Sequence, residues 1–417
     1  MSYASHLQGI GSGATYDKDA VMNLCPRDGR PVQVVMDLQR LRKERGQLGW
    51  YQPDRPSMWR FGGLLALDWD DPGDRQWIVS LGEGHTPLLD LSSDRLARSL
   101  GIGLRLKQDG WPQPGYGANP TQSFKDRGMS MVVSMARRLG LTRLAVPTQG
   151  NAGDSLAEYA LAAGLDVVVV MPDDTPGPLL ERVAALAENH ASVAMELVSG
   201  TIREAGQRVE ERWLPRGYFS VATFREPGWR IEGKKTLGLE IAEPGAPGGA
   251  WRLPDVIVYP TGGGTGMLGM WKAFEELECL GLVGADRPRM IAVQCEATAP
   301  LVEAFDHSLD DTRAVDAGQT MAAGLNVPGG VGHFRVLEIL RRSGGCALAV
   351  SEDAMIATMR HYYGDKNWQL CPEGAATLAV VPELYDRGLI RPSDSVVAVN
   401  TGSLAKYVQD PRDWLER

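Results

Sequence analysis

The sequence has no apolar run that approaches the roughly 20 residues needed to span a bilayer. It also lacks the pattern of a secretion signal, because its start, Met-Ser-Tyr-Ala-Ser-His, has no basic segment followed by an apolar one. Cysteine is scarce: five are present, widely spaced and without a Cys-x-x-Cys pair, namely Cys25, Cys279, Cys295, Cys346 and Cys371. We therefore expect neither a disulfide framework nor a metal site, and we expect a cytoplasmic protein without a membrane partner.

The sequence also has no excess of positive charge, no internal repeats and no low-complexity tracts. The formal net charge of -9, with Lys and Arg scattered along the chain, argues against nucleic acid as the main partner. What the chain does have is length. Its 417 residues, 43% of them hydrophobic, are enough for two or three domains with an ample core. We expect a globular enzyme that binds a small molecule.

Short apolar runs alternate with helical patterns through most of the chain. Strands are expected at residues 144–147, 167–171 and 194–198, and again at 256–259, 291–294, 347–350 and 396–399. Helices are expected at residues 152–163, 177–188 and 202–213, and again at 233–242, 267–280, 351–363 and 374–386. This order predicts βαβ units, and hence an α/β protein with two open parallel-sheet lobes.

The two series of strands suggest a division into lobes. We expect an N-terminal extension at residues 1–80 with one helix at 37–44, a small lobe at 128–229, and a large lobe made of 81–127 and 230–417. Ligands of open parallel sheets bind beyond the carboxyl ends of the strands. The loops after Val146, Tyr259 and Val399 should therefore converge on one cleft.

Residues 119–128 read Asn-Pro-Thr-Gln-Ser-Phe-Lys-Asp-Arg-Gly and predict a turn before a helix. Pro120 biases its neighbour away from helix and Ser123 can cap a helix start, so the helix should begin near Phe124. Lys125 then lies in the first turn, where the positive end of the helix dipole disfavours protonation of its amine. Such a lysine could be a nucleophile. The alternative is a solvated surface lysine at a helix start.

The loop after residues 144–147 joins a strand to a helix through Gly150 and Asn151. N–H groups at a helix start suit an anion, and the carboxamide of Asn151 can donate to a negatively charged oxygen. The alternative is an ordinary strand-to-helix turn.

Three consecutive glycines, Gly262, Gly263 and Gly264, precede Thr265 between a predicted strand and a predicted helix. Phosphate needs several convergent N–H donors with no Cβ in the way, and such a loop provides them. It is not a Walker loop, because Gly-Lys-Ser/Thr is absent. At the end of the last strand, Thr401 offers a hydroxyl, with a simple turn residue as the alternative.

Residues 119–128 resemble the lysine segment of the threonine synthase branch of fold-type II pyridoxal-phosphate enzymes, whose usual form is Asn-Pro-Thr-Gly-Ser-Phe-Lys-Asp-Arg-Gly. The resemblance extends over roughly residues 80 to 407, because the other loops come in the same chain order. It implies pyridoxal 5'-phosphate as cofactor and a homodimer. It also implies that Lys125 forms a Schiff base with the cofactor, Asn151 bonds its ring oxygen, Gly262, Gly263, Gly264 and Thr265 hold its phosphate, and Thr401 meets its pyridine nitrogen.

The same resemblance implies contacts to an amino-acid substrate, with or without a phosphate group, from Thr148, Gln149, Gly150, Ser155 and Arg230. The planar donors of Arg230 suit a phosphate, whereas pairing with Glu226 or Glu232 is the alternative. Two residues depart from the family pattern. Gln122 replaces a glycine that leaves room beside the cofactor, and Gln149 lies next to the expected substrate site.

Residues 24–29, Leu-Cys-Pro-Arg-Asp-Gly, resemble a short zinc-ribbon opening found in some threonine synthases. The second cysteine is missing, since Asp28 stands in that part of the motif. One thiolate cannot make a tetrahedral zinc site. We expect a packing turn, or an arm against a second subunit.

The resemblance implies a pyridoxal-phosphate lyase acting on an O-activated amino acid, namely threonine synthase, which converts O-phosphohomoserine and water to threonine and phosphate. Lys125 would serve as anchor and as base. Two alternatives stay open. One is a serine/threonine dehydratase-type enzyme that performs β-elimination or β-replacement, and the other is a non-enzymatic protein of the same fold that acts as a binding or assembly partner.

Overall fold

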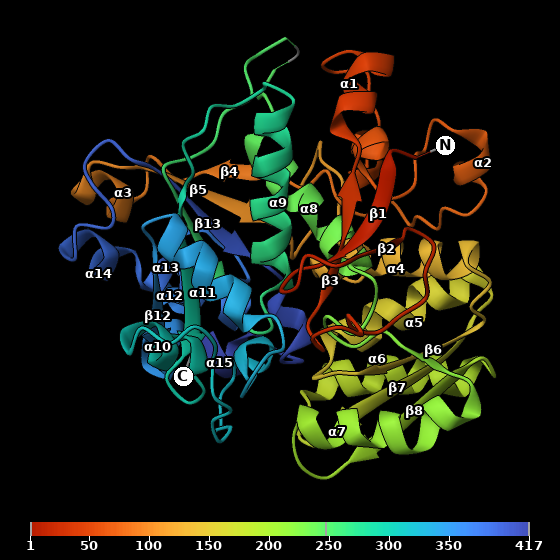
Figure 1. Ribbon diagram of the computed structural model, residues 1–417. Helices are drawn as coiled ribbons and strands as arrows, with labels where there is room; N and C mark the ends of the chain where they lie inside the picture. The colour runs from red at the N-terminus through yellow and green to blue at the C-terminus, as the bar shows by residue number, and fades with distance from the viewer. Residues whose placement is uncertain (1, 247, 416–417) are drawn as a thin grey trace.

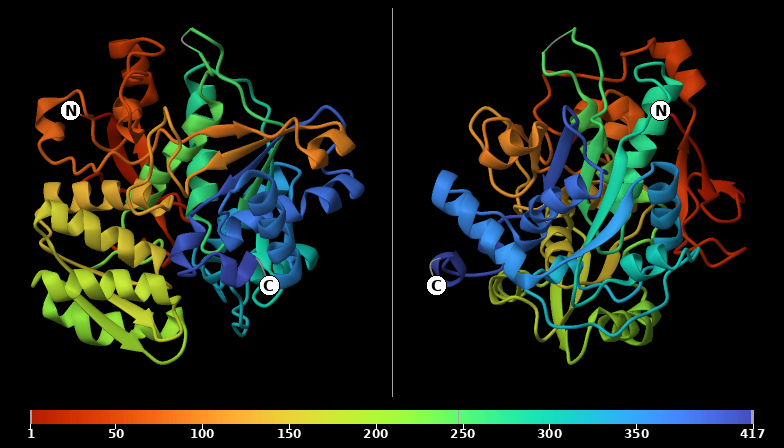
Figure 2. Two further views of the ribbon diagram at one scale, coloured as in Figure 1. Left: turned by 180° about the vertical axis from the view of Figure 1, so that it is seen from behind. Right: turned by 90° about the vertical axis from the view of Figure 1, so that its left-hand side faces the viewer.

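The computed structural model describes residues 2–246 and 248–415, which form three sheets and the helices around them (Figure 1). A six-stranded sheet has the order β12-β11-β10-β13-β5-β4, a four-stranded sheet has the order β8-β7-β6-β9, and a three-stranded sheet has the order β2-β1-β3. Figure 2 shows the first two sheets side by side with helices against them. The predicted α/β architecture with two open parallel sheets is confirmed.

The six-stranded sheet is parallel except at its edge, where β4 runs antiparallel to β5. Its strands are β4 (Leu88–Asp90), β5 (Gly103–Gln108), β10 (Val256–Pro260), β11 (Arg289–Cys295), β12 (Cys346–Val350) and β13 (Ser395–Asn400). The helices of this part are α3 (Arg95–Leu100), α8 (Trp229–Ala242), α9 (Thr265–Cys279), α10 (Pro300–Asp306), α11 (His333–Arg342), α12 (Glu352–Lys366), α13 (Pro372–Ala379), α14 (Val381–Asp386) and α15 (Arg412–Leu415).

The four-stranded sheet is entirely parallel. It consists of β6 (Arg143–Pro147), β7 (Asp166–Pro172), β8 (Val193–Val198) and β9 (Phe219–Ser220), with α4 (Lys125–Arg138), α5 (Asn151–Ala163), α6 (Gly177–Asn189) and α7 (Ile202–Arg208). A π-helical turn (Val209–Trp213) and a 3-10 turn (Leu214–Arg216) extend α7. The strand β7 is apolar almost throughout, because helices cover both faces of such a sheet.

The N-terminal segment forms its own small antiparallel sheet, which the sequence did not predict. It contains β1 (Ala4–Gly9), β2 (Thr15–Asp17), β3 (Val32–Met36), α1 (Leu38–Arg45), a 3-10 stretch (Met58–Leu64) and α2 (Pro72–Arg75). The amide of Asn23 donates to the carbonyls of Ser220 and Arg225 at 2.9 and 2.7 Å, which ties this segment to the end of β9. Cys25 is buried, with Tyr16 Oη 3.1 Å from its sulfur.

The predicted strands and helices from residue 144 onward are present, with one difference. The helix predicted at 374–386 is two helices, α13 and α14, that meet at Val380. Pro382 lies in the first turn of α14 and has no N–H to continue the ladder of α13. The sequence also missed β5 and β9. The exact lobe limits, which fall within α4 and at the start of α8, stay a prediction.

Within the described ranges, no helix is long and apolar enough to cross a membrane. Those ranges also hold no group of three or more His, Cys, Asp or Glu side chains arranged to bind a metal.

Candidate functional site

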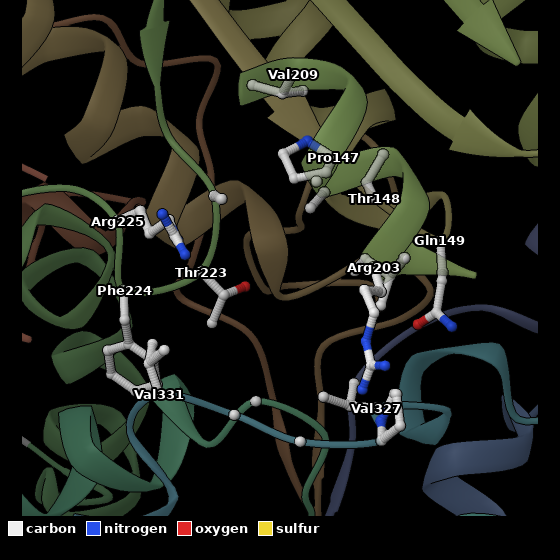
Figure 3. Close-up of a pocket in the computed structure, with 18 of the residues that line it drawn as sticks. Pro147, Thr148, Gln149, Arg203, Val209, Thr223, Phe224, Arg225, Val327 and Val331 are labelled. Atoms are coloured by element: carbon white, nitrogen blue, oxygen red, sulfur yellow. The ribbon is translucent and has the colours of Figure 1, made fainter. Parts of the chain in front are cut away.

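Loops at the carboxyl ends of β6, β10 and β13 converge on one cavity, as the parallel sheets require. The cavity has a volume of about 590 Å³ and its wall includes Lys125, Thr148, Gln149 and Thr223. Figure 3 shows Gln149 and Arg203 on one side and Thr223 and Arg225 on the other. A narrow extension of about 50 Å³ is lined by Lys125, Asn151, Thr401 and the loop at residues 262–265. The lysine, the asparagine, the glycine loop and the threonine therefore share one site.

Lys125 is the first residue of α4, one residue later than the predicted start. The turn before it is fastened to the loop after β13: the N–H of Phe124 donates to the carbonyl of Thr401 at 2.9 Å, and the N–H of Ser403 donates to the carbonyl of Gln122 at 3.1 Å. Ser123 gives only a weak cap, with its Oγ 3.4 Å from the N–H of Lys125. The lysine is positioned mainly by pairing between these two loops.

Burial and, after it, the nearby Arg230 guanidinium lower the pKa of Lys125 to about 8, while Glu373 opposes the shift. The sequence predicted a lowered pKa for a different reason, the helix dipole. Because the amine is buried among few charges, a substantial fraction of it is neutral near physiological pH. A neutral amine can attack a carbonyl carbon and can accept a proton.

The glycine loop provides a close backbone approach at the start of α9. Gly264 has φ 88°, the left-handed region that favours glycine. At Gly263, an added Cβ would lie 2.8 Å from Thr223 Cγ2, closer than such atoms normally approach. The first N–H groups of α9 have no intrahelical acceptor. The loop is therefore a cradle for an anion such as phosphate.

A hydrogen-bonded network of buried polar groups lines the same narrow extension as that cradle. Asn151, the first residue of α5, donates from Nδ2 to the Tyr407 hydroxyl at 2.8 Å, and Tyr407 donates to Glu373 Oε1 at 2.9 Å. Burial raises the pKa of the Glu373 carboxyl and of the Tyr407 phenol. Asn151 Oδ1 and Glu373 Oε2 are buried and have no partner among the described residues. Such groups are positioned for a polar ligand.

Thr401 comes directly after β13 and faces the narrow extension. Its side chain is 7% exposed and its hydroxyl lies 3.8 Å from the Cys371 sulfur, a weak contact. The hydroxyl is therefore free to hydrogen-bond a ligand.

Among the predicted substrate residues, Thr148 and Gln149 line the cavity. Gln149 Nε2 donates to the carbonyl of Asn326 at 2.6 Å, which joins the β6 loop to a 3-10 turn (Ala323–Leu325) of the larger sheet region. Gly150, Ser155 and Arg230 lie behind the wall and are not among its described lining residues.

Two of these residues have identifiable tasks behind the wall. Ser155 donates to Asp126 Oδ1 at 2.6 Å, and burial raises the pKa of Asp126 to about 6 while Ser155 and Thr121 oppose the rise. Arg230 donates from Nη1 to the Thr223 hydroxyl at 3.2 Å and from Nη2 to the carbonyl of Val221. Arg230 thus contacts the cavity through Thr223. The direct substrate contacts predicted for Ser155 and Arg230 stay predictions.

Gln122 departs from the family's glycine without lining the cavity. Its backbone has φ 59°, the left-handed conformation that glycine adopts without strain. Its side chain is not among the described lining residues of the cavity or its extension. The glycine of the family pattern is thus explained by backbone conformation, whereas the sequence suggested a need for room.

Four residues of the site were not assigned from the sequence: Thr223, Lys234, Glu373 and Tyr407. Thr223 comes after β9, a two-residue strand too short to give a periodic pattern. Lys234 Nζ donates to the Thr265 hydroxyl at 2.6 Å. It lies four residues after Arg230, one helical turn along α8, a spacing that could have revealed it.

The chain matches the family model described as pyridoxal-phosphate dependent enzyme over residues 79–402. It belongs to that family. Threonine synthase of Methanosarcina acetivorans is 29% identical over 412 residues, which cover 99% of this chain and 94% of the relative. Threonine synthase of Methanocaldococcus jannaschii is 27% identical over 394 residues, covering 94% and 91%. Pyridoxal phosphate is therefore the cofactor, as predicted.

Solved structures support the same fold. Processed threonine deaminase isoform 2 from Solanum lycopersicum has a TM-score of 0.60 at 21% identity, covering 77% of this chain and 84% of the other. Maize serine racemase has a TM-score of 0.63 at 17% identity, covering 82% and 94%. These likenesses confirm the fold-type II architecture.

The residues present fit pyridoxal phosphate. Its aldehyde needs an amine, which Lys125 offers with a lowered pKa. Its phosphate needs convergent N–H donors, which the glycine loop can supply. Its ring needs polar partners, and Asn151 and Thr401 line the same narrow extension as Lys125. We expect these residues to hold the cofactor.

We expect the rate at which the cofactor-free protein binds pyridoxal phosphate to rise with pH through about 8, because only the neutral amine of Lys125 is nucleophilic. In Arg230→Gln the midpoint should move to higher pH, because a cation that lowers the pKa of the amine is removed. Stopped-flow absorbance between pH 6 and roughly 10.5 covers the titration. An unchanged or lower midpoint in Arg230→Gln would contradict this electrostatic account.

Proposed function

We propose that the protein is a threonine synthase, which removes phosphate from O-phosphohomoserine and adds water to form threonine. The observation that carries the proposal is likeness over the full chain. Two threonine synthases match 99% and 94% of it, whereas the deaminase and racemase structures match 77% and 82%. The likeness to these two synthases therefore extends beyond residues 79–402, the part matched by the family model.

The cofactor, when bound, supplies an electron sink for carbanion chemistry on the amino acid. The residues of the chain would then position groups and move protons. Lys125, with its lowered pKa, is suited to accept and return protons at the carbon atoms of the substrate. Thr401 offers a hydroxyl, a neutral partner that does not impose a full positive charge on a ring nitrogen.

The cavity wall also suits an anionic substrate. Arg203 and Arg225 line it from opposite sides (Figure 3), and Glu210 and Asp311 line it as well. Arg225 is partly neutralised by Glu210 at 2.7 Å. Thr223 lines both the cavity and its narrow extension, and Arg230 fixes its hydroxyl from behind. We propose that Thr223 contacts the phosphate of the substrate and that Arg230 positions it.

Thr223→Val is expected to raise KM for O-phosphohomoserine about 10-fold with a smaller change in kcat, because the substitution removes a hydrogen bond that holds the substrate. Steady-state phosphate release gives both constants. Thr358→Val on α12, outside the described cavity lining, is the matched control and should leave both constants unchanged. A fall in kcat alone would place Thr223 in the chemical step and contradict its assignment to binding.

A substrate panel tests the function itself. The purified protein is incubated separately with O-phosphohomoserine, threonine and O-phosphoserine, and inorganic phosphate, threonine and keto acids are measured. We expect phosphate and threonine in equal amounts from O-phosphohomoserine alone. Keto acid from threonine or O-phosphoserine would instead indicate the dehydratase-type reaction, and no product from any of them would favour a binding protein.

We further propose a homodimer in the cytoplasm. The five cysteines are all free, and Cys279 is exposed, which suits a reducing compartment. Sedimentation of the purified protein at several concentrations measures its mass. A monomeric mass at all of them would contradict the dimer.

A further inference from the structure

A second buried lysine lies beside the phosphate cradle. Lys234, on α8, is 2% exposed and donates from Nζ to the Thr265 hydroxyl at 2.6 Å. Its Nζ lies 4.7 Å from the centroid of the Phe124 ring, and the Nζ of Lys125 lies 4.6 Å from the same centroid. The described part of the cofactor-binding region thus contains the amines of Lys125 and Lys234. The sequence pattern indicated a role only for Lys125.

The charge of Lys234 lacks a close counter-ion, in contrast to its neighbour. Lys235 lies 2.9 Å from carboxylate oxygens of both Glu232 and Glu276. For Lys234, the described part of the chain places no carboxylate oxygen within 4 Å, and the acid that influences it electrostatically is Glu226. A buried cation without an anion is costly, so such an amine loses its proton unless an anion binds beside it.

We propose that Lys234 is a positioning residue for the phosphate of pyridoxal phosphate, acting through Thr265. Its ammonium group donates to a lone pair of the Thr265 oxygen, which leaves the hydroxyl hydrogen free to donate into the cradle. Its positive charge adds to the N–H groups at the start of α9. Thr265 lines the narrow extension, whereas Lys234 lies behind it.

The electrostatics of the pocket agree with this assignment. Burial and, after it, the charges of Lys125 and Arg230 hold the pKa of Lys234 well below its usual range. A phosphate dianion beside Thr265 would offset these effects and favour the charged amine. The assignment depends on the cofactor and not on the proposed substrate.

The test compares pyridoxal phosphate with pyridoxal, which lacks the phosphate. Cofactor is removed from the full-length protein, and both compounds are titrated by absorbance and tryptophan fluorescence. In Lys234→Gln we expect the Kd of pyridoxal phosphate to rise about 10-fold, because a charge-assisted hydrogen bond to the anion site is lost. The Kd of pyridoxal should stay the same. Inorganic phosphate should compete with pyridoxal phosphate less well in this variant than in the wild type.

A double-mutant cycle tests the path through Thr265. Thr265→Val should weaken pyridoxal phosphate binding to a similar extent, and the double variant Lys234→Gln/Thr265→Val should lose little more than either single variant. Lys234→Met keeps the apolar stem of the side chain and should behave like Lys234→Gln. Lys43→Gln, an exposed position on α1, makes the same charge change and should bind as the wild type does.

Equal losses for pyridoxal phosphate and pyridoxal would overturn the proposal, because they would indicate a structural role for Lys234. An unchanged Kd for both compounds would overturn it as well. So would fully additive losses in the double variant. These measurements need no substrate, so a failed assignment of Lys234 stays distinguishable from a failed threonine synthase assay.

Discussion

Lys125→Ala is expected to abolish the visible absorbance of the bound cofactor and to lower the rate of product formation by about 10³-fold or more. The amine is the group that can react with the aldehyde of pyridoxal phosphate and carry protons during turnover. Alanine keeps the start of α4 helical, and the backbone bonds between this turn and Thr401 do not involve the side chain. The loss is therefore expected without unfolding.

Absorbance spectra after reconstitution and a phosphate-release assay measure the two effects. Lys43→Ala, an exposed lysine on α1, is the matched control and should retain both signals. The outcome that would contradict the assignment is specific: a Lys125→Ala protein that still acquires the visible band. Lys234 would then be the reacting amine, since its Nζ lies at nearly the same distance from the Phe124 ring.

The sequence was most informative where a short motif determines local backbone geometry. The glycines at residues 262–264 need no tertiary information to indicate an anion cradle, and Asn151 and Thr401 come after strands whose apolar runs are unmistakable. Parallel strands end at one edge, so the convergence of these loops could be inferred from the order of elements. Lys125, Asn151, Gly263 and Thr401 accordingly share one site.

Residues that act through a neighbour were harder to find from the sequence. Thr223 lies in the loop after β9, whose two residues carry no periodicity, and its hydroxyl accepts a hydrogen bond from Arg230 of α8. The role of Lys234 can be recognised only from its hydrogen bond to Thr265, which lies in another helix. The lowered pKa of Lys125 was anticipated, but its main cause, burial, depends on packing that a sequence does not reveal.

The N-terminal sheet was missed for a different reason. Its strands β1 and β2 are partly exposed and do not show strict alternation of buried and exposed residues. Short, half-exposed strands are stabilised by their partners more than by their own sequence. Such strands can be recognised only when the pairing of all strands in the sheet is known.

Arg127→Met is expected to lower the free energy of unfolding by about 3–5 kcal/mol, because it breaks a buried ion cluster. The guanidinium is fully buried, with Nε 2.7 Å from Asp109 Oδ2 and with Nη1 and Nη2 each 2.8 Å from a Glu240 oxygen. Lys107 Nζ lies 2.6 Å from Glu240. Without Arg127, one lysine faces two buried carboxylates, and α4 loses its ion pairs with Asp109 and Glu240.

Urea unfolding monitored by tryptophan fluorescence measures the difference. Arg137→Met is the matched control on the same helix, because among the described residues the Arg137 guanidinium makes a single long bond, 3.5 Å to the carbonyl of Trp77. This control should change stability by about 0.5 kcal/mol or less. A similar decrease in the free energy of unfolding in both variants would show that α4 tolerates neither substitution. The buried ion cluster would then contribute no more to stability than Arg137 does.

The pH dependence separates the charge interaction from packing. Burial raises the pKa of Glu240, but Arg127 and Lys107 outweigh it and hold that pKa well below its usual range. A carboxylate with a depressed folded pKa contributes stability above its unfolded pKa of about 4.3, and this contribution is lost as the pH falls toward the folded value. Arg127→Met removes the main cause of the depression. The stability gap between the wild type and Arg127→Met should therefore narrow below about pH 4. A stability difference that stays constant with pH would mean that lost packing alone accounts for the effect of Arg127→Met. The ion pairs between α4, which carries Lys125, and its neighbours would then contribute nothing to the stability of the protein.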